Sequence, residues 1–319
     1  MNDVQAWSQR ICNNIETVFY GKTNIVKQIL AALLAQGHVL LDDVPGLGKT
    51  VLARSLAVSI GAKLSRIQAT PDLMPSDVLG VSVYNPQDGS FKYRKGPIVA
   101  NIILVDEINR ATPRTQSALL EAMAEQQVSI EGKTLALPQP FFLIATQNPI
   151  DFEGTFPLPE AQKDRFLLTL SLGYPDREIE KNILRFHGKT HNPLAELKEN
   201  GSLEELPKLQ EMVTTVHIAD SIIDYIINLA EATRTDPNLR MGISPRGTLA
   251  LYRCSQALAA MAGRDYVIPE DVRELIIPAF ISRILPRQVS LIKGIDSLQI
   301  LKSITERIPA PHISEGYQA

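Results

Sequence analysis

The sequence predicts an α/β fold in which helices cover both faces of a parallel sheet, followed by a second domain made of helices. From Val39 to about Leu172, short apolar runs alternate with longer segments of helical period, as in a doubly wound sheet. A glycine-rich loop joins the first run to a helix. After Gly173-Tyr174-Pro175 we find no further run typical of a buried strand. We therefore place a three-layer domain at residues 1–174 and a helical domain at 175–319.

The apolar runs set the bounds of five expected strands. These are His38–Leu41, Leu64–Gln68, Ile102–Val105, Phe141–Ala145 and Phe166–Ser171. Two of the helices between them have clear ends. One runs over Lys49–Ile60 and is closed by Gly61, and the other runs over Pro113–Gln126, with Thr112 as its N-cap.

Two segments of the first domain break this alternation and predict β-hairpins. They are Val81–Arg94, turning at Asp88-Gly89, and Val128–Leu137, turning at Gly132. In the second domain, helices are expected near residues 176–188, 203–214, 220–234, 245–262 and 269–284. The stretch Gly188–Gly201 is polar and predicts a loop, so the HxxxH spacing of His187 and His191 does not indicate a zinc helix.

Composition is that of an ordinary globular protein. Of 319 residues, 45% are hydrophobic and 21% charged, and 32 basic against 35 acidic side chains leave a net charge of -3, which gives no general reason to bind nucleic acid. Neither a leader segment nor the roughly 18 apolar residues of a membrane span is seen. We expect a cytoplasmic protein without membrane insertion, whose cysteines Cys12 and Cys254 stay reduced.

The strongest functional signal lies between His38 and Thr50, where a strand runs into a glycine-rich loop that opens a helix. Gly46 and Gly48 let backbone amides turn toward a phosphate, Lys49 pairs with the β- and γ-phosphates, and the Thr50 hydroxyl binds magnesium. The candidate phosphate-binding residues are Pro45, Gly46, Leu47, Gly48, Lys49, Thr50 and Val51. Asp43 replaces the first glycine of the usual P-loop pattern, so its carboxylate is expected to point away from the phosphate.

Polar residues end two other expected strands. Asp106 can hold magnesium through water, and Glu107 can orient the water that attacks the γ-phosphate. Asn148 can hydrogen-bond both that water and the γ-phosphate, although an Asn-Pro pair by itself more often marks a turn. Together these residues predict binding of a polyphosphate with Mg²⁺.

At this point the chain resembles the MoxR family of AAA+ ATPases over nearly its whole length. Besides the P-loop, the runs Asp106–Met123 (DEINRATPRTQSALLEAM) and Ala145–Phe166 (ATQNPIDFEGTFPLPEAQKDRF) are similar to the signatures of that family. The resemblance implies a P-loop AAA+ three-layer αβα domain with an all-helical lid, and ATP hydrolysis with Mg²⁺.

The resemblance also implies roles that spacing cannot assign. Asn148 would be sensor 1, and Arg165 an arginine finger that reaches the γ-phosphate in the next subunit. Arg246 would be sensor 2, aimed at the nucleotide of its own subunit from a helix that Ser244 caps and a proline opens. Tyr20 and Gly21 resemble the segment that lines the adenine pocket, and aromatic core packing is the alternative for this segment.

A trans arginine finger implies a ring of copies, by resemblance a hexamer. The same resemblance implies chaperone-like remodelling, maturation or metal-cofactor insertion of a client protein complex, together with a von Willebrand factor A domain partner. Two alternatives remain open. One is a DNA-remodelling or helicase-like motor, and the other is a nucleotide-gated scaffold with little turnover.

Overall fold

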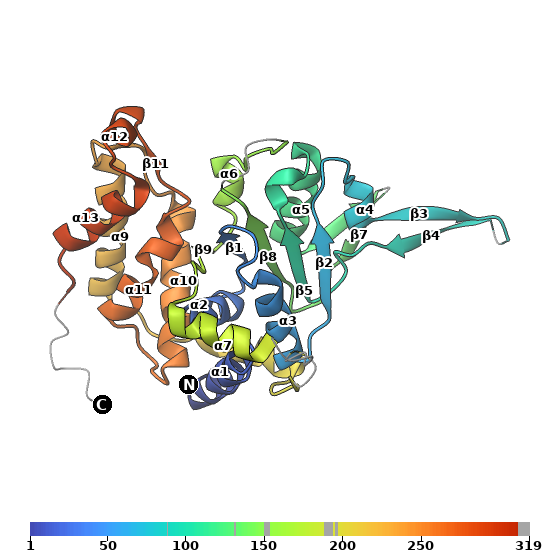
Figure 1. Ribbon diagram of the computed structural model, residues 1–319, viewed down its shortest axis with the longest axis horizontal. Helices are drawn as coiled ribbons and strands as arrows, with labels where there is room; N and C mark the ends of the chain where they lie inside the picture. The colour runs from blue at the N-terminus through green and yellow to red at the C-terminus, as the bar shows by residue number, and fades with distance from the viewer. Residues whose placement is uncertain (88, 131, 150–153, 188–193, 195–196, 312–319) are drawn as a thin grey trace.

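A five-stranded parallel sheet forms the centre of the first domain (Figure 1). The computed structural model describes residues 1–311 apart from 88, 131, 150–153, 188–193 and 195–196. The strand order is β2-β5-β8-β1-β9, and every neighbouring pair is parallel. The strands are β1 (Val39–Asp42), β2 (Leu64–Gln68), β5 (Ile102–Asp106), β8 (Phe142–Gln147) and β9 (Leu168–Leu170). The expected parallel sheet is therefore confirmed.

Helices cover both faces of this sheet, because successive strand residues point to opposite sides. Val39 and Leu41 of β1 belong to one core, and Leu40 belongs to the other. The first core is completed by α1 (Asn2–Glu16), α2 (Thr23–Leu34) and α3 (Lys49–Ser59). The second contains side chains of α4 (Pro75–Leu79) and α5 (Pro113–Glu125). Burial on both faces explains why the strands read as continuous apolar runs. Short helices η1 (Ile108–Arg110) and α6 (Glu160–Lys163) follow β5 and β8 along the chain.

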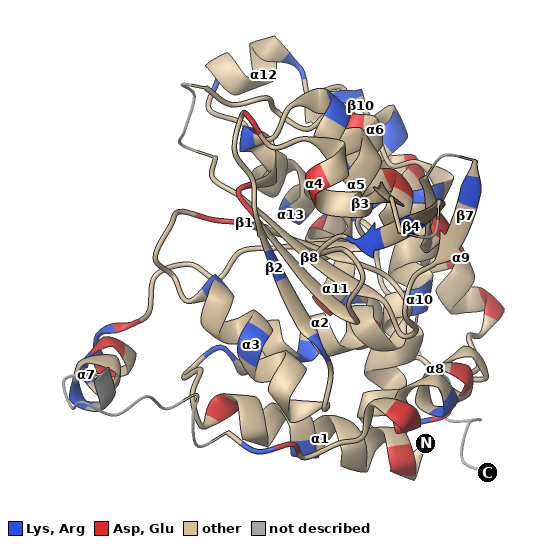
Figure 2. Ribbon diagram, turned by 90° about the vertical axis from the view of Figure 1, so that its right-hand side faces the viewer, with Lys and Arg blue, Asp and Glu red and all other residues tan. Residues whose placement is uncertain are grey.

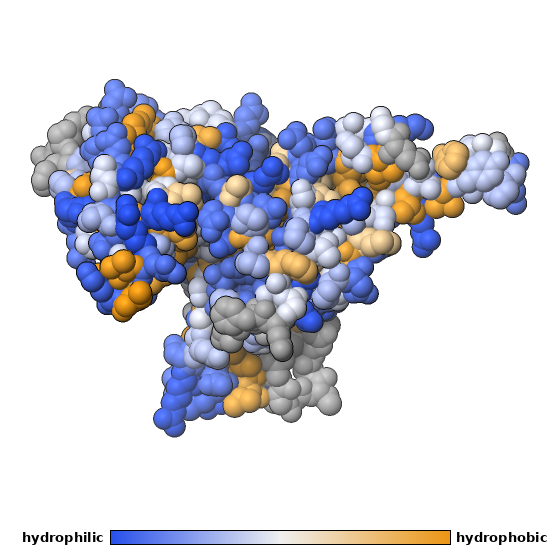
Figure 3. Space-filling view, turned by 90° about the horizontal axis from the view of Figure 1, so that it is seen from above, coloured by the Kyte–Doolittle hydropathy of each residue, from blue (hydrophilic) through white to orange (hydrophobic). Residues whose placement is uncertain are grey.

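Both hairpin segments form antiparallel pairs. These are β3 (Gly80–Asn85) with β4 (Ser90–Lys95), and β6 (Gln127–Ile130) with β7 (Lys133–Ala136). The first expected turn includes residue 88, and the second, at Gly132, directly follows residue 131; residues 88 and 131 lie outside the described part of the chain. The pair β3–β4 extends from the body as an arm (Figure 1), and Figure 3 shows hydrophobic residues along it. On this arm Tyr84 and Phe91 are 53% and 60% exposed, with ring centroids 5.3 Å apart.

The C-terminal half is helical, as expected. Its helices are α7 (Arg177–His187), η3 (Leu203–Glu205), α8 (Leu206–Thr214), α9 (Asp220–Thr235), α10 (Pro245–Met261), α11 (Pro269–Phe280), α12 (Gln288–Ile292) and α13 (Ser297–Arg307). This half also contains a two-stranded antiparallel sheet that was not predicted, between β10 (Leu239–Met241) and β11 (Leu285–Pro286). His191 and much of the loop 188–201 lie outside the described residues.

The helical half packs against the first domain through α10, which contacts α1 and α2. Figure 2 shows α7 standing apart from the other helices. The division at residue 174 remains a prediction. Cys12 and Cys254 are buried and unpaired, and burial raises the pKa of their thiols to about 11 and about 12. Among the described helices, none has the length and apolar character needed to cross a bilayer.

Candidate functional site

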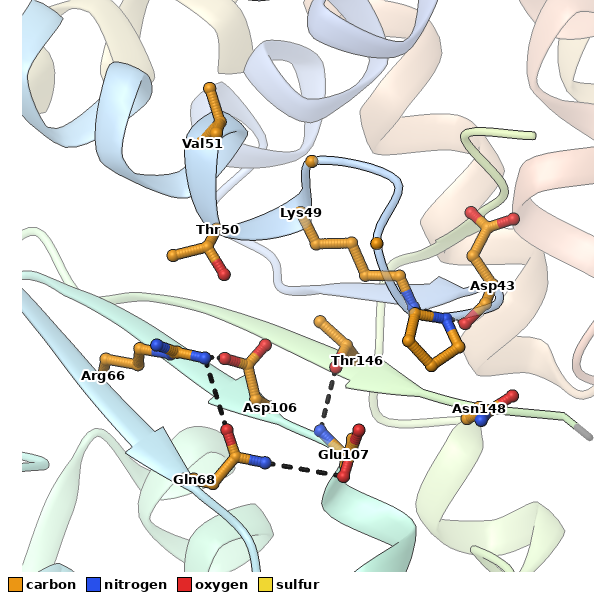
Figure 4. Close-up of a pocket in the computed structure, with 13 residues that line it drawn as sticks. Asp43, Lys49, Thr50, Val51, Arg66, Gln68, Asp106, Glu107, Thr146 and Asn148 are labelled. Carbon is orange, nitrogen blue, oxygen red and sulfur yellow. Dashed lines mark hydrogen bonds and ion pairs between the residues drawn. The ribbon is translucent and has the colours of Figure 1, made fainter. Parts of the chain in front are cut away.

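The glycine-rich loop lies between the end of β1 and the start of α3. Gly46 and Gly48 have φ angles of +86° and +85°, in the left-handed region that glycine adopts without strain. Gly48 is also the N-cap of α3. Lys49 Nζ donates to the carbonyl oxygen of Asp43, so the ammonium lies across the loop (Figure 4). A loop of this shape before a helix N-terminus is suited to bind an anion.

Asp43 replaces a glycine of the usual pattern, and its carboxylate is turned toward the segment after β9. It accepts hydrogen bonds from Ser171 Oγ at 2.8 Å, from the backbone N–H of Leu172, and from the N–H of Gly173 at 3.3 Å. The expectation that this carboxylate points away from the phosphate position is met. The departure from the pattern thus adds an anchor for the loop.

Two carboxylates lie at the end of β5, facing the loop. Asp106 Oδ2 accepts from Arg66 Nε at 2.6 Å. Glu107 has a φ angle of +55°, which is rare for a residue with a side chain, and its N–H donates to Thr146 Oγ1 at 2.9 Å. Its carboxylate accepts from Arg110 at 3.0 Å and from Gln68 Nε2 at 3.5 Å. The left-handed backbone turns the Glu107 side chain into the cavity while Thr146 fixes the peptide.

One cavity joins all of these groups. It is lined by Asp43, Pro45, Gly46, Gly48, Lys49, Thr50, Val51, Arg66, Gln68, Asp106, Glu107, Thr146 and Asn148. Burial lowers the pKa of Lys49, and the Asp43, Asp42, Asp106 and Glu107 carboxylates offset part of that effect. Asn148 is buried at the end of β8, and its carbonyl oxygen accepts from Asn109 Nδ2 at 3.3 Å.

The oxygen donors of this cavity fit magnesium. Thr50 and Asp106 face the same space (Figure 4). Mg²⁺ usually binds one or two protein oxygens, keeps several waters, and takes the remaining ligands from phosphate. Within the described residues, no group of three or more His, Cys, Asp and Glu side chains could hold a metal by itself. The two oxygen donors of Thr50 and Asp106 suit a metal that takes its other ligands from water and a polyphosphate.

A second, mainly apolar cavity adjoins the first and shares Gly46, Gly48 and Val51 with it. Its other walls are Val18, Phe19, Tyr20, Lys22, Leu47, Gly173, Pro175, Ile179 and Ile183. Gly21 has a φ angle of +70°, and a Cβ there would lie 1.9 Å from Ile179 Cδ1. The segment around Tyr20 thus forms part of an apolar cavity beside the phosphate loop, which suits a purine base.

Arg165 and Arg246 line neither cavity. Arg165 is exposed and donates to the carbonyl oxygen of Leu120 at 2.9 Å. Arg246 is exposed in the first turn of α10, where Ser244 caps the helix and Pro245 begins it. Ser244 Oγ also donates to the carboxylate of Asp164. This contact places the first turn of α10, and with it Arg246, beside Asp164, the residue before Arg165.

Sequence reasoning missed four polar residues that line or border the site: Arg66, Gln68, Arg110 and Thr146. Arg66 and Gln68 stand at alternate positions of β2, so both point to one face of the sheet. A polar pair two residues apart at a strand end was an available signal. The pair could be assigned to the site only because the structure places β2 beside β5, which carries Asp106.

Comparisons with known proteins match two parts of the chain to family models. Residues 38–168 match the family model described as ATPase family associated with various cellular activities (AAA), and residues 231–301 match an AAA lid domain. The chain is 48% identical to protein YeaC of Bacillus subtilis, covering 93% of each chain. It is 38% identical to Chaperone MoxR1 of Mycobacterium tuberculosis, covering 96% of this chain and 83% of that one.

A crystal structure from Cytophaga hutchinsonii superimposes with a TM-score of 0.89 at 34% identity, covering 98% of both chains. The phosphate loop and the two carboxylates at the end of β5 fall within the first match, and α10 and α11 fall within the second. The chain therefore belongs to the AAA+ ATPases and, within them, to the MoxR family.

Proposed function

We propose that this protein binds ATP with Mg²⁺, hydrolyses it, and uses the cycle to remodel a partner protein complex. The observation that carries the proposal is one cavity in which the phosphate loop, Asp106, Glu107 and Asn148 meet. A chaperone among the relatives supports the remodelling role. The net charge of -3 favours this role over a DNA motor.

The residues of the cavity divide the work of phosphoryl transfer. Amides of Gly46 and Gly48 and the Lys49 ammonium bind the phosphates, and Thr50 and Asp106 hold the metal. Bound Mg²⁺ would neutralise charge that develops on the phosphate oxygens. Glu107 accepts a proton from the attacking water, and Asn148 orients that water. Glu107 must first release Arg110, which now donates to it at 3.0 Å.

Arg165 supplies the remaining positive charge from a neighbouring subunit in this proposal. Its exposure and its absence from the lining of its own chain's cavity support a role in trans, within a ring that we propose to be a hexamer. Arg246 was expected to serve its own subunit. Its position beside Asp164 supports a role on the same side as Arg165, toward the neighbour.

The β3–β4 arm is a candidate contact for a client or for a von Willebrand factor A domain partner. Its exposed aromatic pair and the cationic strand β4 support binding to protein surfaces. Deleting residues 86–90 should spare basal ATP turnover and abolish stimulation by the partner. Unchanged stimulation would remove the arm from the proposal.

The test of the shared site is ATP turnover measured against protein concentration. Turnover should rise steeply as the ring assembles, should be lost in Arg165→Ala and in Glu107→Gln, and should partly return when these two variants are mixed. Arg10→Ala is the matched control, because Arg10 is exposed on α1 and pairs only weakly, with Glu205 at 3.5 Å. Turnover that is independent of concentration and insensitive to Arg165→Ala would refute the trans site. An assembled ring without turnover would indicate a nucleotide-gated scaffold.

A further inference from the structure

Arg66 forms an ion pair with the carboxylate that the proposed function assigns to magnesium. It comes from the middle of β2, next to β5 in the sheet, and its Nε lies 2.6 Å from Asp106 Oδ2. The Asp106 side chain is only 11% exposed, whereas that of Arg66 is 54% exposed. The buried partner of this pair is thus the carboxylate, and the arginine lies on its solvent side.

A buried carboxylate without a cation is unfavourable, and here the cavity holds two carboxylates in succession, Asp106 and Glu107. Lys49 lies across the loop on the carbonyl oxygen of Asp43. Arg66 is therefore the cation in direct contact with Asp106. In Figure 4 its guanidinium lies against the Asp106 carboxylate, in the part of the cavity that Thr50 also faces.

A guanidinium and a hydrated Mg²⁺ compete for the same carboxylate, because both are cations and would repel each other across it. We propose that Arg66 is a placeholder cation, which neutralises Asp106 until Mg²⁺ arrives with ATP and displaces it. The inference rests on the proposed binding of Mg²⁺ with ATP. It assigns to Arg66 a positioning role, acting on the metal through Asp106.

This role has a consequence for how strongly nucleotide binding depends on magnesium. With Arg66 present, ATP without metal enters a cavity in which Asp106 is already neutralised, and Mg²⁺ must displace a cation to bind. Without Arg66, metal-free ATP meets an uncompensated carboxylate, while Mg²⁺ meets no competitor. Loss of Arg66 should therefore weaken the binding of metal-free ATP and increase the factor by which Mg²⁺ tightens ATP binding.

The test is calorimetric titration of the full chain with a non-hydrolysable ATP analogue, in excess magnesium and in EDTA at equal ionic strength. The readout is the ratio of the Kd in EDTA to the Kd in magnesium. A charge-assisted hydrogen bond implies that Arg66→Gln raises this ratio about tenfold over wild type. Arg66→Met, which keeps the apolar stem, should give the same increase and serves if the glutamine variant does not fold.

Arg110→Gln is the matched control. It removes a positive charge that pairs with Glu107 and leaves the ion pair between Arg66 and Asp106 intact. Its ratio should rise clearly less than that of Arg66→Gln, because an uncompensated Glu107 disfavours metal-free ATP but frees no oxygen that the proposal assigns to Mg²⁺. Folded Arg66 variants with the wild-type ratio, or an equal rise in Arg110→Gln, would overturn the placeholder role. Absence of nucleotide binding by wild type in magnesium would instead refute the proposed ATPase function.

Discussion

Acidification should destabilise this protein through one buried histidine, His38 at the start of β1. Its Nδ1 accepts from the N–H of Leu143 at 3.1 Å, and its Nε2 lies 3.1 Å from the carbonyl oxygen of Met123. A backbone N–H can only donate, so Nδ1 must be unprotonated and Nε2 must carry the proton. Burial lowers the pKa of His38 from 6.5 to about 4. Protonation of Nδ1 would turn it into a donor facing the N–H of Leu143, so this hydrogen bond would be lost.

The sign and size of the effect follow from linkage. Because the folded-state pKa of His38 lies below the unfolded value, its contribution is complete above pH 6.5 and is lost as the pH falls toward about 4. A gap of about 2.5 pH units corresponds to about 3 kcal/mol of unfolding free energy. Other titrating groups also change the free energy of unfolding with pH. The contribution of His38 is therefore measured as the difference between wild type and a variant that lacks this histidine.

Urea unfolding followed by fluorescence suits this test, because Trp7 is the single tryptophan and is 1% exposed. The free energy of unfolding of wild type and of His38→Gln would be measured at several pH values across this window. We expect His38→Gln to be less stable at neutral pH and to lose about 3 kcal/mol less on acidification. Parallel pH profiles for the two proteins would refute the assignment of a neutral, hydrogen-bonded His38.

Three further predictions concern the site and its supports. Asp43→Ala removes the acceptor of three hydrogen bonds and should lower the free energy of unfolding by about 2–4 kcal/mol in urea titrations, with a smaller loss in Asp43→Asn. Gly21→Ala combines a φ angle of +70° with a 1.9 Å clash against Ile179, and should weaken ATP binding roughly tenfold by calorimetry. Asp164→Ala leaves the Arg283 guanidinium, whose side chain is 2% exposed, without its carboxylate and should cost about 3–5 kcal/mol in thermal or urea unfolding.

Each of these predictions has an outcome that contradicts it. Equal stability of Asp43→Ala and wild type would show that the segment after β9 does not anchor the loop. If Gly21→Ala binds ATP normally, the apolar cavity is not the base site. Ile179→Ala added to Gly21→Ala should recover part of the binding, because it removes the clashing atoms. An Asp164→Ala variant as stable as wild type would mean that backbone carbonyls alone compensate Arg283.

Local patterns in the sequence predicted the parts of the site that one segment builds by itself. The strand, loop and helix around Lys49, and the two carboxylates after β5, depend on apolar period, glycine and the order of residues along the chain. The pairing of Arg66 with Asp106 depends instead on which strands become neighbours. That order follows from packing of the whole sheet, and no spacing within either segment encodes it.

The same limit explains the other differences. β10 and β11 pair across a long stretch of chain, and each is too short to show a period of its own. The position of Arg246 depends on how α10 meets Asp164, a contact between segments that are 80 residues apart. Its location in the first turn of a capped helix was predictable, and the proposal that it acts toward the neighbouring subunit rests on this contact.

The anchoring of Asp43 also bears on the thermodynamics of ligand capture. The phosphate loop is fixed at one end by the bonds of Asp43 to residues 171–173, and at the other end by the first turn of α3. Only residues 44–48 remain to be ordered around an incoming anion, and two of these are glycines, whose freedom is otherwise the most expensive to remove. Much of the conformational entropy of the loop is thus lost already when the chain folds, and less remains to be lost when the anion binds. Preorganisation of this kind favours tight binding of a small, strongly hydrated ligand.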